Sequence, residues 1–220
     1  MFNLCDIGTS DYQSCFDLQL LLRKKRQEEK IPNFLLFTEH PAVYTMGKQD
    51  ASADLLNLSP IPLIKTNRGG RITYHGPGQL VGYFMVSLSS LKMNIPQFVS
   101  SIEELLIHTL SHWDIKANRD AEYPGVWVGQ EKIAALGLHF DHGVSMHGFA
   151  LNLHPQLQDY EAIIPCGIQG RGVTSMEKIL NKRVEKNEVM LKLVESLAQV
   201  FQKKIQWIEK MHLITGGSFF

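Results

Sequence analysis

The sequence predicts one α+β domain spanning residues 1–220. Short apolar runs punctuated by glycine and proline, which are typical of β-strands, crowd the middle of the chain between residues 33 and 154. Segments with apolar residues at helical spacing lie before, between and after these runs. No internal repeat, low-complexity linker or change in composition divides the chain, and 220 residues are enough to bury a substantial core.

The first half of the chain is expected to begin with a helix that Ser10 or Asp11 caps and that continues to about Glu29. Its apolar face would carry Tyr12, Phe16 and Leu20. Strands are predicted at residues 33–39 and 42–47, separated by a His-Pro pair, and then at residues 62–65, 71–75 and 79–88. Between the last two, the sequence GPGQ predicts a tight turn, in which Pro77 fixes one dihedral angle and Gly78 permits a positive φ.

The second half continues with a helix over residues 97–113, directly after Pro96. Its apolar stripe would consist of Phe98, Ile102, Leu105, Leu106 and Leu110. A hairpin is expected over residues 125–140, turning near residues 129–130, and a further strand over residues 144–154. The last helix would cover residues 188–204, followed by a candidate strand at 205–208. The inward face of that helix would be formed by Met190, Leu193, Val194, Leu197 and Phe201.

Composition excludes several classes of partner. Lys and Arg together number 22, as do Asp and Glu, so the formal net charge at pH 7 is zero and offers no basic surface for nucleic acid or an anionic membrane. The N-terminal residues lack the pattern of a signal peptide, and no apolar run reaches transmembrane length. The three cysteines are odd in number and show no CxxC spacing, so we expect reduced thiols in a cytoplasmic protein rather than disulfides.

The most informative local pattern is RGGRITYHGPGQLVGY, residues 68–83. It combines a short strand with glycines that let the backbone approach another molecule closely. Arg68 and Arg71 bracket Gly69 and Gly70, and His75 ends the strand. Glycine-rich hairpins are common, but this density of charged and small residues favours a loop that accepts a ligand.

Two further segments hold candidate site residues. Lys132 follows a predicted turn and precedes the apolar run IAAL, so it is expected at the edge of the core, where it could act as an acid or base or lower the pKa of a neighbouring thiol. In HGFALNLH, residues 147–154, the small residues after His147 could form a ligand-binding wall, or equally a core strand with a glycine at a bulge.

The remaining cysteine pattern is IIPCGI, in which Cys166 lies between a proline and a glycine. Taken alone, Cys166 could be a reactive thiol or a small residue in a sharp bend. Cys5 and Cys15, near the first helix, are expected to be ordinary core or surface thiols.

Most familiar catalytic signatures are absent: the sequence holds no GxxxxGK[ST], GxGxxG, HExxH or GxSxG pattern. HFDHGVSMH offers a candidate metal site, because imidazoles and a carboxylate lie close together in the sequence. The candidate ligands are His139, Asp141, His142 and His147. Their spacing fits no compact metal motif, so a polar turn between two strands is the favoured interpretation.

Taken together, EHPAVYTMG, RGGRITYHGPGQLVGY, GVWVGQEKIAALG, HGFALNL and IIPCGI…VTSM occur in the order found in the lipoyl(octanoyl) transferases, and the chain resembles that family from its first helix to about residue 176. The resemblance implies the fold of the biotin/lipoate protein ligase catalytic domain, a mixed β-sheet with packed helices. It implies transfer of an octanoyl group from octanoyl-acyl carrier protein to a specific lysine of its acceptors. These are the lipoyl domains of 2-oxoacid dehydrogenase E2 subunits and the glycine-cleavage H protein.

The resemblance also assigns roles. Cys166 would carry the acyl group as a thioester, and Lys132 would stabilise its thiolate and then act as a base. An apolar slot for the acyl chain would be lined by Arg68, Gly69, Gly70, Arg71, Ile72, Thr73, Tyr74, His75, Ala135, Leu136, Gly137, Gly148, Phe149 and Ala150. Backbone N–H groups of the glycine-rich segments could bind the oxyanion. No metal, ATP or other cofactor is required, because the donor is already an activated thioester.

Two alternatives stay open. An ATP-dependent lipoate or biotin protein ligase of the same fold would use GGRITYH and a lysine against an acyl-adenylate and would have no use for Cys166, whereas PCG and HGPGQ favour the transferase. A non-catalytic module that binds lipoyl domains or acyl chains would hold Cys166 as a structural residue. Because the acyl carrier protein is acidic by family expectation, a local basic patch is expected, with Arg68, Arg71 and Arg171 as candidates.

Overall fold

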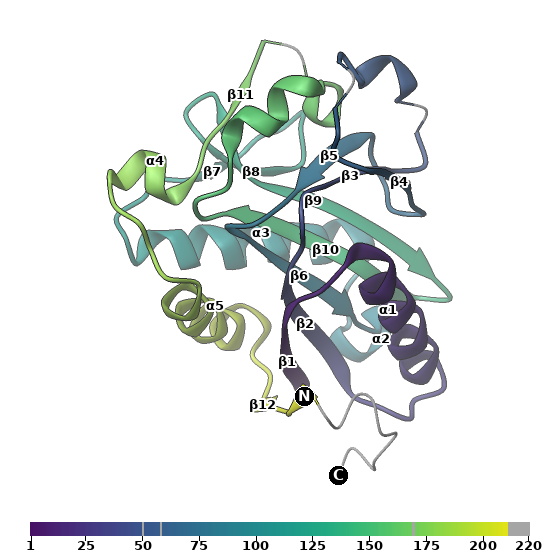
Figure 1. Cartoon of the computed structure of the whole chain (residues 1–220). Coiled ribbons are helices and arrows are strands. Elements are labelled where there is room, and N and C mark those ends of the chain that lie inside the picture. Colours follow the sequence, from purple (N-terminus) through teal and green to yellow (C-terminus); the bar gives the residue numbers. More distant parts are fainter. Residues whose placement is uncertain (50, 58, 169, 211–220) are drawn as a thin grey trace.

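The computed structural model describes residues 1–49, 51–57, 59–168 and 170–210, and its centre is a large mixed sheet with strand order β12-β1-β2-β6-β10-β9-β8-β7, with β11 paired to β9 (Figure 1). The strands of this sheet are β1 (Phe2–Thr9), β2 (Asn33–Glu39), β6 (Gln79–Met85), β7 (Asn118–Arg119), β8 (Gly125–Val128), β9 (Glu131–Asp141), β10 (Val144–Asn152), β11 (Gly172–Val173) and β12 (Ile205–Trp207). A small sheet of order β4-β3-β5 lies beside it and comprises β3 (Val43–Met46), β4 (Leu63–Lys65) and β5 (Ile72–His75).

Helices cover both faces of the large sheet. The helix α1 (Tyr12–Gln27) packs on β10 and β6, whereas α3 (Ile95–Ser111) and α5 (Lys186–Phe201) pack against each other on the opposite face (Figure 1). Strand β2 explains why both faces are apolar: Leu35 and Phe37 face the α3–α5 core, and Phe34 and Leu36 face the α1 core. This alternation follows from the two-residue period of a strand. The short helices are α2 (Leu88–Leu91) and α4 (Met176–Leu180).

The start of α1 agrees with the prediction, but its buried face does not. Asp11 caps the helix, because its side chain accepts a hydrogen bond from the Ser14 N–H at 2.9 Å. Tyr12 is buried as expected, whereas Phe16 and Leu20 are only partly buried. The stripe facing the sheet instead consists of Tyr12, Cys15, Gln19, Leu22 and Arg26. Apolar periodicity did not predict this stripe, because two of its residues, Gln19 and Arg26, are polar.

The other two long helices confirm their predictions. In α3, the stripe of Phe98, Ile102, Leu105, Leu106 and Leu110 is fully buried. A capping box starts this helix, in which Asn94 accepts from the Gln97 N–H and Gln97 accepts from the Asn94 N–H. In α5, the predicted inward residues are buried, except Val194, which is partly buried.

The strands of the middle region also follow the prediction. The hairpin of β8 and β9 turns at residues 129–130, and β9 and β10 form a second hairpin through residues 142–143. The GPGQ turn closes with a hydrogen bond from the Gln79 N–H to the Gly76 carbonyl, and Gly78 has φ +85°. The spacing of apolar residues predicted strands but did not show that β3, β4 and β5 form a sheet of their own. Strand β1, which pairs with β2 and β12, was not predicted at all.

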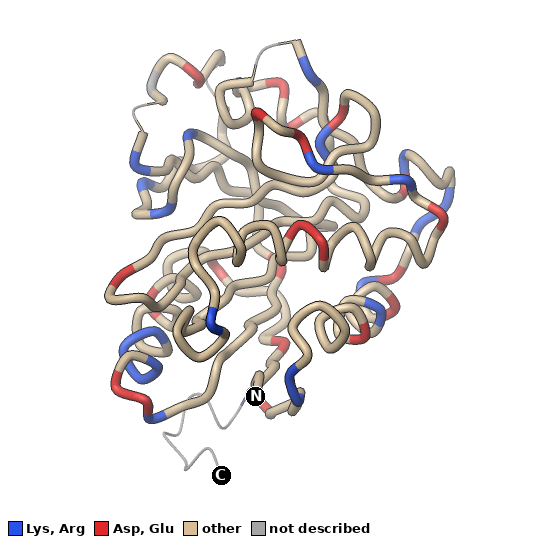
Figure 2. The backbone as a smooth tube through the Cα atoms, turned by 180° about the vertical axis from the view of Figure 1, so that it is seen from behind, with Lys and Arg blue, Asp and Glu red and all other residues tan. Residues whose placement is uncertain are grey.

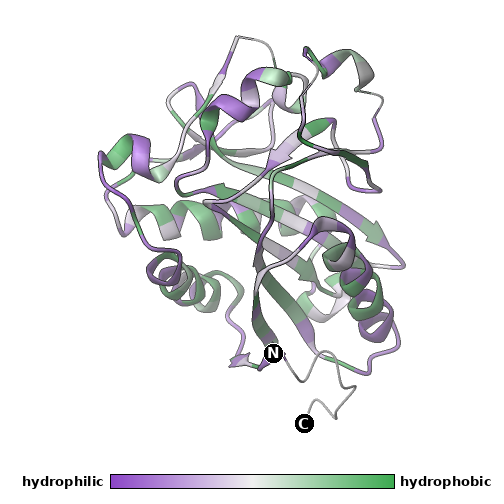
Figure 3. Cartoon of the chain, viewed as in Figure 1, coloured by the Kyte–Doolittle hydropathy of each residue, from purple (hydrophilic) through white to green (hydrophobic). Residues whose placement is uncertain are grey.

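Surface chemistry agrees with the composition. Apolar residues concentrate in the strands of the large sheet and on the inner helix faces, and polar residues lie on the outer faces (Figure 3). In the backbone view from behind, Lys and Arg positions and Asp and Glu positions both occur on most of the segments drawn (Figure 2). Among the described residues, no helix has the length and apolar character needed to cross a bilayer.

Candidate active site

A cavity lies where α1 and the small sheet meet the large sheet. The empty space within it is about 390 Å³, part of which is open to solvent. Its lining residues are Tyr12, Arg68, Thr73, His75, Tyr83, Ala135, Leu136, Gly137, His147, Gly148, Phe149, Ala150 and Cys166. Most of these were predicted as site residues from the sequence. Tyr12, Tyr83 and His147 were not.

Cys166 reaches the cavity on a 3₁₀ turn, η3 (Pro165–Gly167). Its backbone is left-handed, with φ 57° and ψ 16°, and its side chain is half-buried. Gly167 also has a positive φ, and a Cβ there would lie 2.5 Å from Arg71 Cδ, so this position needs glycine. The Pro-Cys-Gly sequence thus makes a bend that the other two cysteines, which are fully buried, do not share.

Both ends of the cysteine segment are anchored. Before the turn, the Ile164 N–H donates to the Asp54 carbonyl at 2.7 Å, and the Asp54 carboxylate accepts two hydrogen bonds from Arg71. After the turn, β11 pairs in parallel with β9, with Val173 beside Lys132. These contacts hold Cys166 between the small sheet and the large one.

Lys132 is buried, as expected for a residue at the core edge, but it does not line the cavity. Its ammonium donates to the Pro124 carbonyl at 3.1 Å and lies 4.8 Å from the centre of the Trp127 ring. Within the described residues it makes no hydrogen bond to Cys166 Sγ. The pairing of β11 with β9 is therefore what keeps Lys132 and the cysteine segment in the same region.

The segment 68–75 contributes only some of its predicted residues to the cavity. Thr73 and His75 face it, whereas Ile72 and Tyr74, on the opposite side of β5, pack into the small-sheet core. The loop is docked on β9, because the Gly69 N–H donates to the Leu138 carbonyl at 2.8 Å. Gly69, Gly70, Arg71, Ile72 and Tyr74 thus support the cavity rather than line it.

Arg68 is the cation of the cavity. It is buried, and it donates to the Thr45 carbonyl at 2.5 Å and to Thr45 Oγ1. Burial lowers the pKa of Arg68, and nearby groups including Cys166 act in the opposite direction, because their negative forms favour the guanidinium. Arg68 and Cys166 line the same cavity.

The predicted walls on the two central strands come together as one surface. Antiparallel pairing places Gly148 beside Gly137, Phe149 beside Leu136, and Ala150 beside Ala135. Gly148 is required by close packing, since a Cβ there would lie 2.1 Å from the Gly82 carbonyl oxygen of β6. The small residues among these pairs leave space above this stretch of the sheet. Because the paired residues are glycines and apolar residues, the wall that they form is mainly apolar.

The histidines around the cavity are neutral at physiological pH. Burial, the largest cause, lowers the pKa of His75 to about 3, and burial likewise lowers the pKa of His147 to about 3. His40 lies behind them, and burial lowers its pKa too. His40 Nδ1 donates to the Ser10 carbonyl at 2.7 Å, so Nε2 accepts from the Tyr83 hydroxyl at 2.8 Å.

The three lining residues that the sequence did not reveal come from separate elements. Tyr12 begins α1, and its ring stacks on His75 with a centroid distance of 5.9 Å. Tyr83 lies on β6 and His147 on β10. The sequence did place Tyr12 on the inner face of its helix, but only the tertiary fold shows that this face meets His75.

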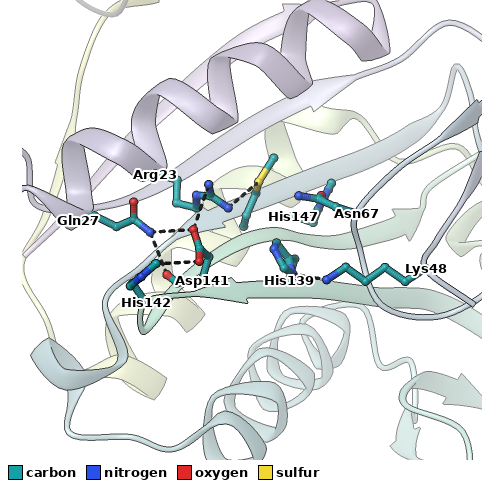
Figure 4. Close-up of polar contacts among 9 residues, drawn as sticks. Arg23, Gln27, Lys48, Asn67, His139, Asp141, His142 and His147 are labelled. Carbon is teal, nitrogen blue, oxygen red and sulfur yellow. Dashed lines mark hydrogen bonds and ion pairs between the residues drawn. The ribbon is translucent and has the colours of Figure 1, made fainter.

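The four candidate metal ligands of residues 139–147 do not converge (Figure 4). His139 accepts from the Lys48 ammonium at 3.3 Å, and His147 donates to Asn67 Oδ1 at 2.6 Å. Asp141 contacts Arg23, Gln27 and His142 instead. The favoured interpretation, a polar turn between two strands, agrees with the β9–β10 hairpin.

The predicted basic patch of Arg68, Arg71 and Arg171 is wrong. Arg68 is buried, and Arg71 pairs with Asp54. Arg171 pairs with Asp120 at 2.6 Å and stacks on Trp127 at 3.7 Å from the ring centre. Each guanidinium hydrogen-bonds or pairs with another group of this chain: Arg68 with Thr45, Arg71 with Asp54 and Arg171 with Asp120.

The remaining thiols are inert by burial, which raises the pKa of Cys5 to about 11 and the pKa of Cys15 to about 12. Cys166 is thus the thiol with access to a ligand cavity. Its surroundings, an apolar wall, neutral imidazoles and one buried guanidinium, suit an uncharged reacting group with an apolar chain.

Comparison with known proteins gives consistent matches. The family model described as "Lipoyl protein ligase A/B catalytic domain" matches residues 11–198. The chain is 41% identical over 211 residues to an octanoyltransferase of Alkaliphilus metalliredigens, covering 92% of this chain and 96% of that one. It is 38% identical over 219 residues to an octanoyltransferase of Caldicellulosiruptor saccharolyticus, covering 96% and 93%.

A solved structure shows the same fold. The bipartite lipoate protein ligase of Thermoplasma acidophilum, studied with its E2 lipoyl domain, superimposes with a TM-score of 0.73 at 16% identity. The match covers 94% of this chain and 86% of that chain. The predicted α+β fold with a mixed sheet is therefore confirmed.

Proposed function

The chain belongs to the lipoyl protein ligase A/B catalytic-domain family and, within it, to the octanoyltransferases, which are acyltransferases; from this membership we propose that Cys166 carries an octanoyl group between two proteins. The donor is octanoyl-acyl carrier protein. The acceptor is the target lysine of a lipoyl domain in a 2-oxoacid dehydrogenase E2 subunit or of the glycine-cleavage H protein.

One observation carries this proposal: Cys166 is presented by a strained turn at a cavity whose opposite wall is small and apolar. An acyl chain can lie along Ala135–Gly137 and Gly148–Ala150 while its thioester carbon meets the sulfur. Such a wall favours a hydrocarbon chain, because burying each methylene contributes about 0.8 kcal/mol.

The reaction divides into two transfers. In the first, the Cys166 sulfur forms a bond to the acyl carbon, the donor's carbon–sulfur bond breaks, and the carrier thiol leaves with the proton that Cys166 gave up. In the second, the acceptor amine nitrogen bonds to the acyl carbon and the bond to Cys166 breaks. The amine loses a proton, and the sulfur regains one. Each step exchanges one acyl bond for another, so the activated donor replaces any need for ATP or a metal.

Lys132 and Arg68 are proposed to act on the thiol in different ways. Arg68 offers a fixed positive charge near Cys166. Lys132, as an ammonium paired with the Cys166 thiolate, would give its proton to the departing carrier thiol and, now neutral, accept one from the amine, after exchanging its present contact with the Pro124 carbonyl. The thioester oxyanion requires other donors than the Gly69 and Gly167 N–H groups, because these already bond to the Leu138 and Ile164 carbonyls.

We place this reaction in the cytoplasm, because a catalytic thiol must stay reduced. We propose that one catalytic domain carries both transfers without nucleic acid or a membrane. The formal net charge of zero supports this choice of protein partners.

The test is to incubate the protein with octanoyl-acyl carrier protein alone and to measure its intact mass. We expect a mass increase of one octanoyl group in the native protein and none in Cys166→Ala. The Cys5→Ala variant serves as the matched control and should still be acylated, because burial keeps that thiol protonated. Addition of a lipoyl domain should then move the group to the acceptor.

Two outcomes would overturn the proposal. If the mass does not change and free octanoate with ATP supports transfer, the chain is a ligase. This alternative is included because a lipoate protein ligase has the same fold. If no condition modifies either protein, Cys166 is structural and the chain is a binding module.

A further inference from the structure

Behind the cavity wall, Gln79 joins four polar groups that the reaction scheme above does not use. Gln79 is the first residue of β6, and it is fully buried. Its Oε1 lies 2.7 Å from His75 Nδ1. Its Nε2 lies 2.9 Å from Asn152 Oδ1, 3.0 Å from the Tyr160 hydroxyl and 3.4 Å from the Tyr74 carbonyl.

Two backbone carbonyls fix the direction of every hydrogen bond in this network, because a carbonyl can only accept. The Thr174 carbonyl accepts from Asn152 Nδ2 at 2.9 Å, so Asn152 Oδ1 must face Gln79. The Tyr74 carbonyl requires the same orientation of the Gln79 amide independently. Gln79 Nε2 therefore donates on one side, and Gln79 Oε1 is left to accept from His75.

The consequence is a single tautomer of His75. Its Nδ1 carries the hydrogen that Gln79 Oε1 accepts, so Nε2 is an unprotonated acceptor. Nε2 forms no hydrogen bond within the described part of the chain, and it is not among the enclosed polar atoms that lack partners. Since His75 lines the cavity beside Cys166, this lone pair is available to a molecule inside it.

The surroundings of His75 keep the ring neutral. The charged or titratable groups facing it are Tyr12, His40, Arg68, His147 and Cys166. Burial is the largest of the causes that lower the pKa of His75 to about 3; His40, Arg68 and His147 act in the same direction, whereas the bond to Gln79 opposes them. The ring therefore enters the reaction as a hydrogen-bond acceptor rather than as a carrier of a proton.

We propose that Gln79 is a positioning residue that holds His75 in the Nδ1–H tautomer, so that His75 Nε2 accepts a hydrogen bond from the attacking amine of the acceptor lysine. This inference rests on the proposed function. An acyl chain and its thioester carbonyl contain no donor, whereas the amine brings N–H groups to the thioester carbon. A hydrogen bond from one amine N–H to His75 Nε2 would orient the amine so that its own nitrogen lone pair points at the thioester carbon.

The tautomer can be read directly from the ¹⁵N shifts of His75 in the native protein, without any substrate. We expect the Nδ1–H pattern in the native protein and a mixture of tautomers in Gln79→Leu, whose thermal unfolding shows whether it folds. Tyr160→Phe is the matched control, because Gln79 keeps its Asn152 and Tyr74 partners, and the native pattern should persist. An Nε2–H pattern in the native protein overturns the inference.

The two half-reactions then test the role of the tautomer. We expect Gln79→Leu to slow transfer from octanoylated protein to a lipoyl domain about tenfold, the effect of losing one hydrogen bond, while acylation of Cys166 changes less than about twofold. In a His75→Ala background, Gln79→Leu should have no further effect on transfer. Equal slowing in both backgrounds overturns the inference.

The isosteric variant gives an independent readout. In Gln79→Glu, the carboxylate oxygen that replaces Nε2 cannot donate to the Asn152 Oδ1 and Tyr74 carbonyl oxygens that face it, so we expect transfer to be slowed as in Gln79→Leu. Near-native transfer in Gln79→Glu would contradict a network whose orientation is set by donation from Gln79 Nε2. If the native protein forms no acyl-enzyme at all, the proposed function fails, and the ¹⁵N pattern still decides whether Gln79 sets the tautomer.

Discussion

At φ 57° the backbone of Cys166 is in a left-handed conformation that costs a residue with a Cβ about 1 kcal/mol or more. Such a conformation persists only where neighbouring contacts determine it. Here the neighbours are the Ile164 bond to Asp54 on one side and β11 on the other. The sulfur is thus held at the cavity by the fold instead of sampling rotamers on a loop.

The two cations near the thiol can be distinguished by alkylation. In Lys132→Ala, we expect the pH of half-maximal alkylation of Cys166 to rise by about one unit, because loss of an ammonium makes the thiolate harder to form. Iodoacetamide followed by peptide mapping reports on Cys166, since the pKa values of Cys5 and Cys15 are raised to about 11 and about 12.

The matched control for that experiment is Lys178→Ala. Lys178 pairs with Glu131, the residue next to Lys132, but on the exposed surface, so its removal should leave the alkylation profile unchanged. An unmoved profile in Lys132→Ala would mean that Arg68, not Lys132, favours the thiolate.

Sequence motifs identified the cavity at residue level wherever one segment supplies several of its residues. The walls at 135–137 and 148–150 were predicted in full, because neighbouring strands in register bring contiguous residues together. In segment 68–75 the motif named both faces of β5, and only alternation along the strand separates Thr73 and His75 from the rest. Tyr12 and Tyr83 lie outside the predicted set, because helix-to-sheet packing brings Tyr12 to the cavity and the pairing of β6 with β10 places Tyr83 opposite Gly148.

Among the elements, the β9–β10 hairpin shows how glycine sets the width of the site. Gly148→Ala would place a methyl group 2.1 Å from the Gly82 carbonyl of β6, so the strands must separate. We expect a loss of about 1–3 kcal/mol in the free energy of unfolding, measured by urea denaturation.

The cross-strand partner of Gly148 supplies the control. A methyl group in Gly137→Ala meets Arg68 Cδ at 3.2 Å, so Arg68 must shift by only a few tenths of an ångström and no strands have to separate. This variant should lose much less stability. If both variants lose the same amount, backbone contact between β6 and β10 is not what requires Gly148.

The long helices and central strands were predictable because their apolar spacing matches the period of the element. Helix α3 combines a continuous apolar stripe with a capping signal, and both are visible in the chain. Strand β1 escaped prediction because its partners lie at residues 33–39 and 205–207, so nothing local marks it. The face of α1 was misplaced because buried Gln19 and Arg26 are polar and find their partners outside the helix, at His147 of β10 and at Asn33, the first residue of β2.

For the molecule as a whole, buried neutral histidines make stability depend on pH. Burial lowers the pKa of His75 and of His147 to about 3, and it lowers the pKa of His40 as well. Between about pH 6.5 and pH 3 the unfolded chain binds protons that the folded chain does not, so stability falls as pH falls through this window. Each histidine with a pKa near 3 removes about 2 kcal/mol between pH 7 and pH 5.

Urea unfolding at pH 7 and at pH 5 measures this effect, in a range where carboxyl groups stay largely ionised in both states. His147→Gln should reduce the difference between the two pH values, whereas the exposed His112→Gln should not. A pH-independent free energy of unfolding in the native protein would show that these imidazoles bind protons equally in the folded and unfolded states.

The arrangement of the cavity along the chain has a consequence for synthesis. Tyr12 is made early, the walls of β9 and β10 much later, and the Cys166 turn with its anchoring strand β11 later still. A ribosome therefore exposes the apolar walls before the segment that completes the cavity has emerged. A nascent chain that pauses before residue 174 would expose the apolar wall while Cys166 is not yet anchored. We expect such a chain to bind a chaperone, because it exposes apolar surface.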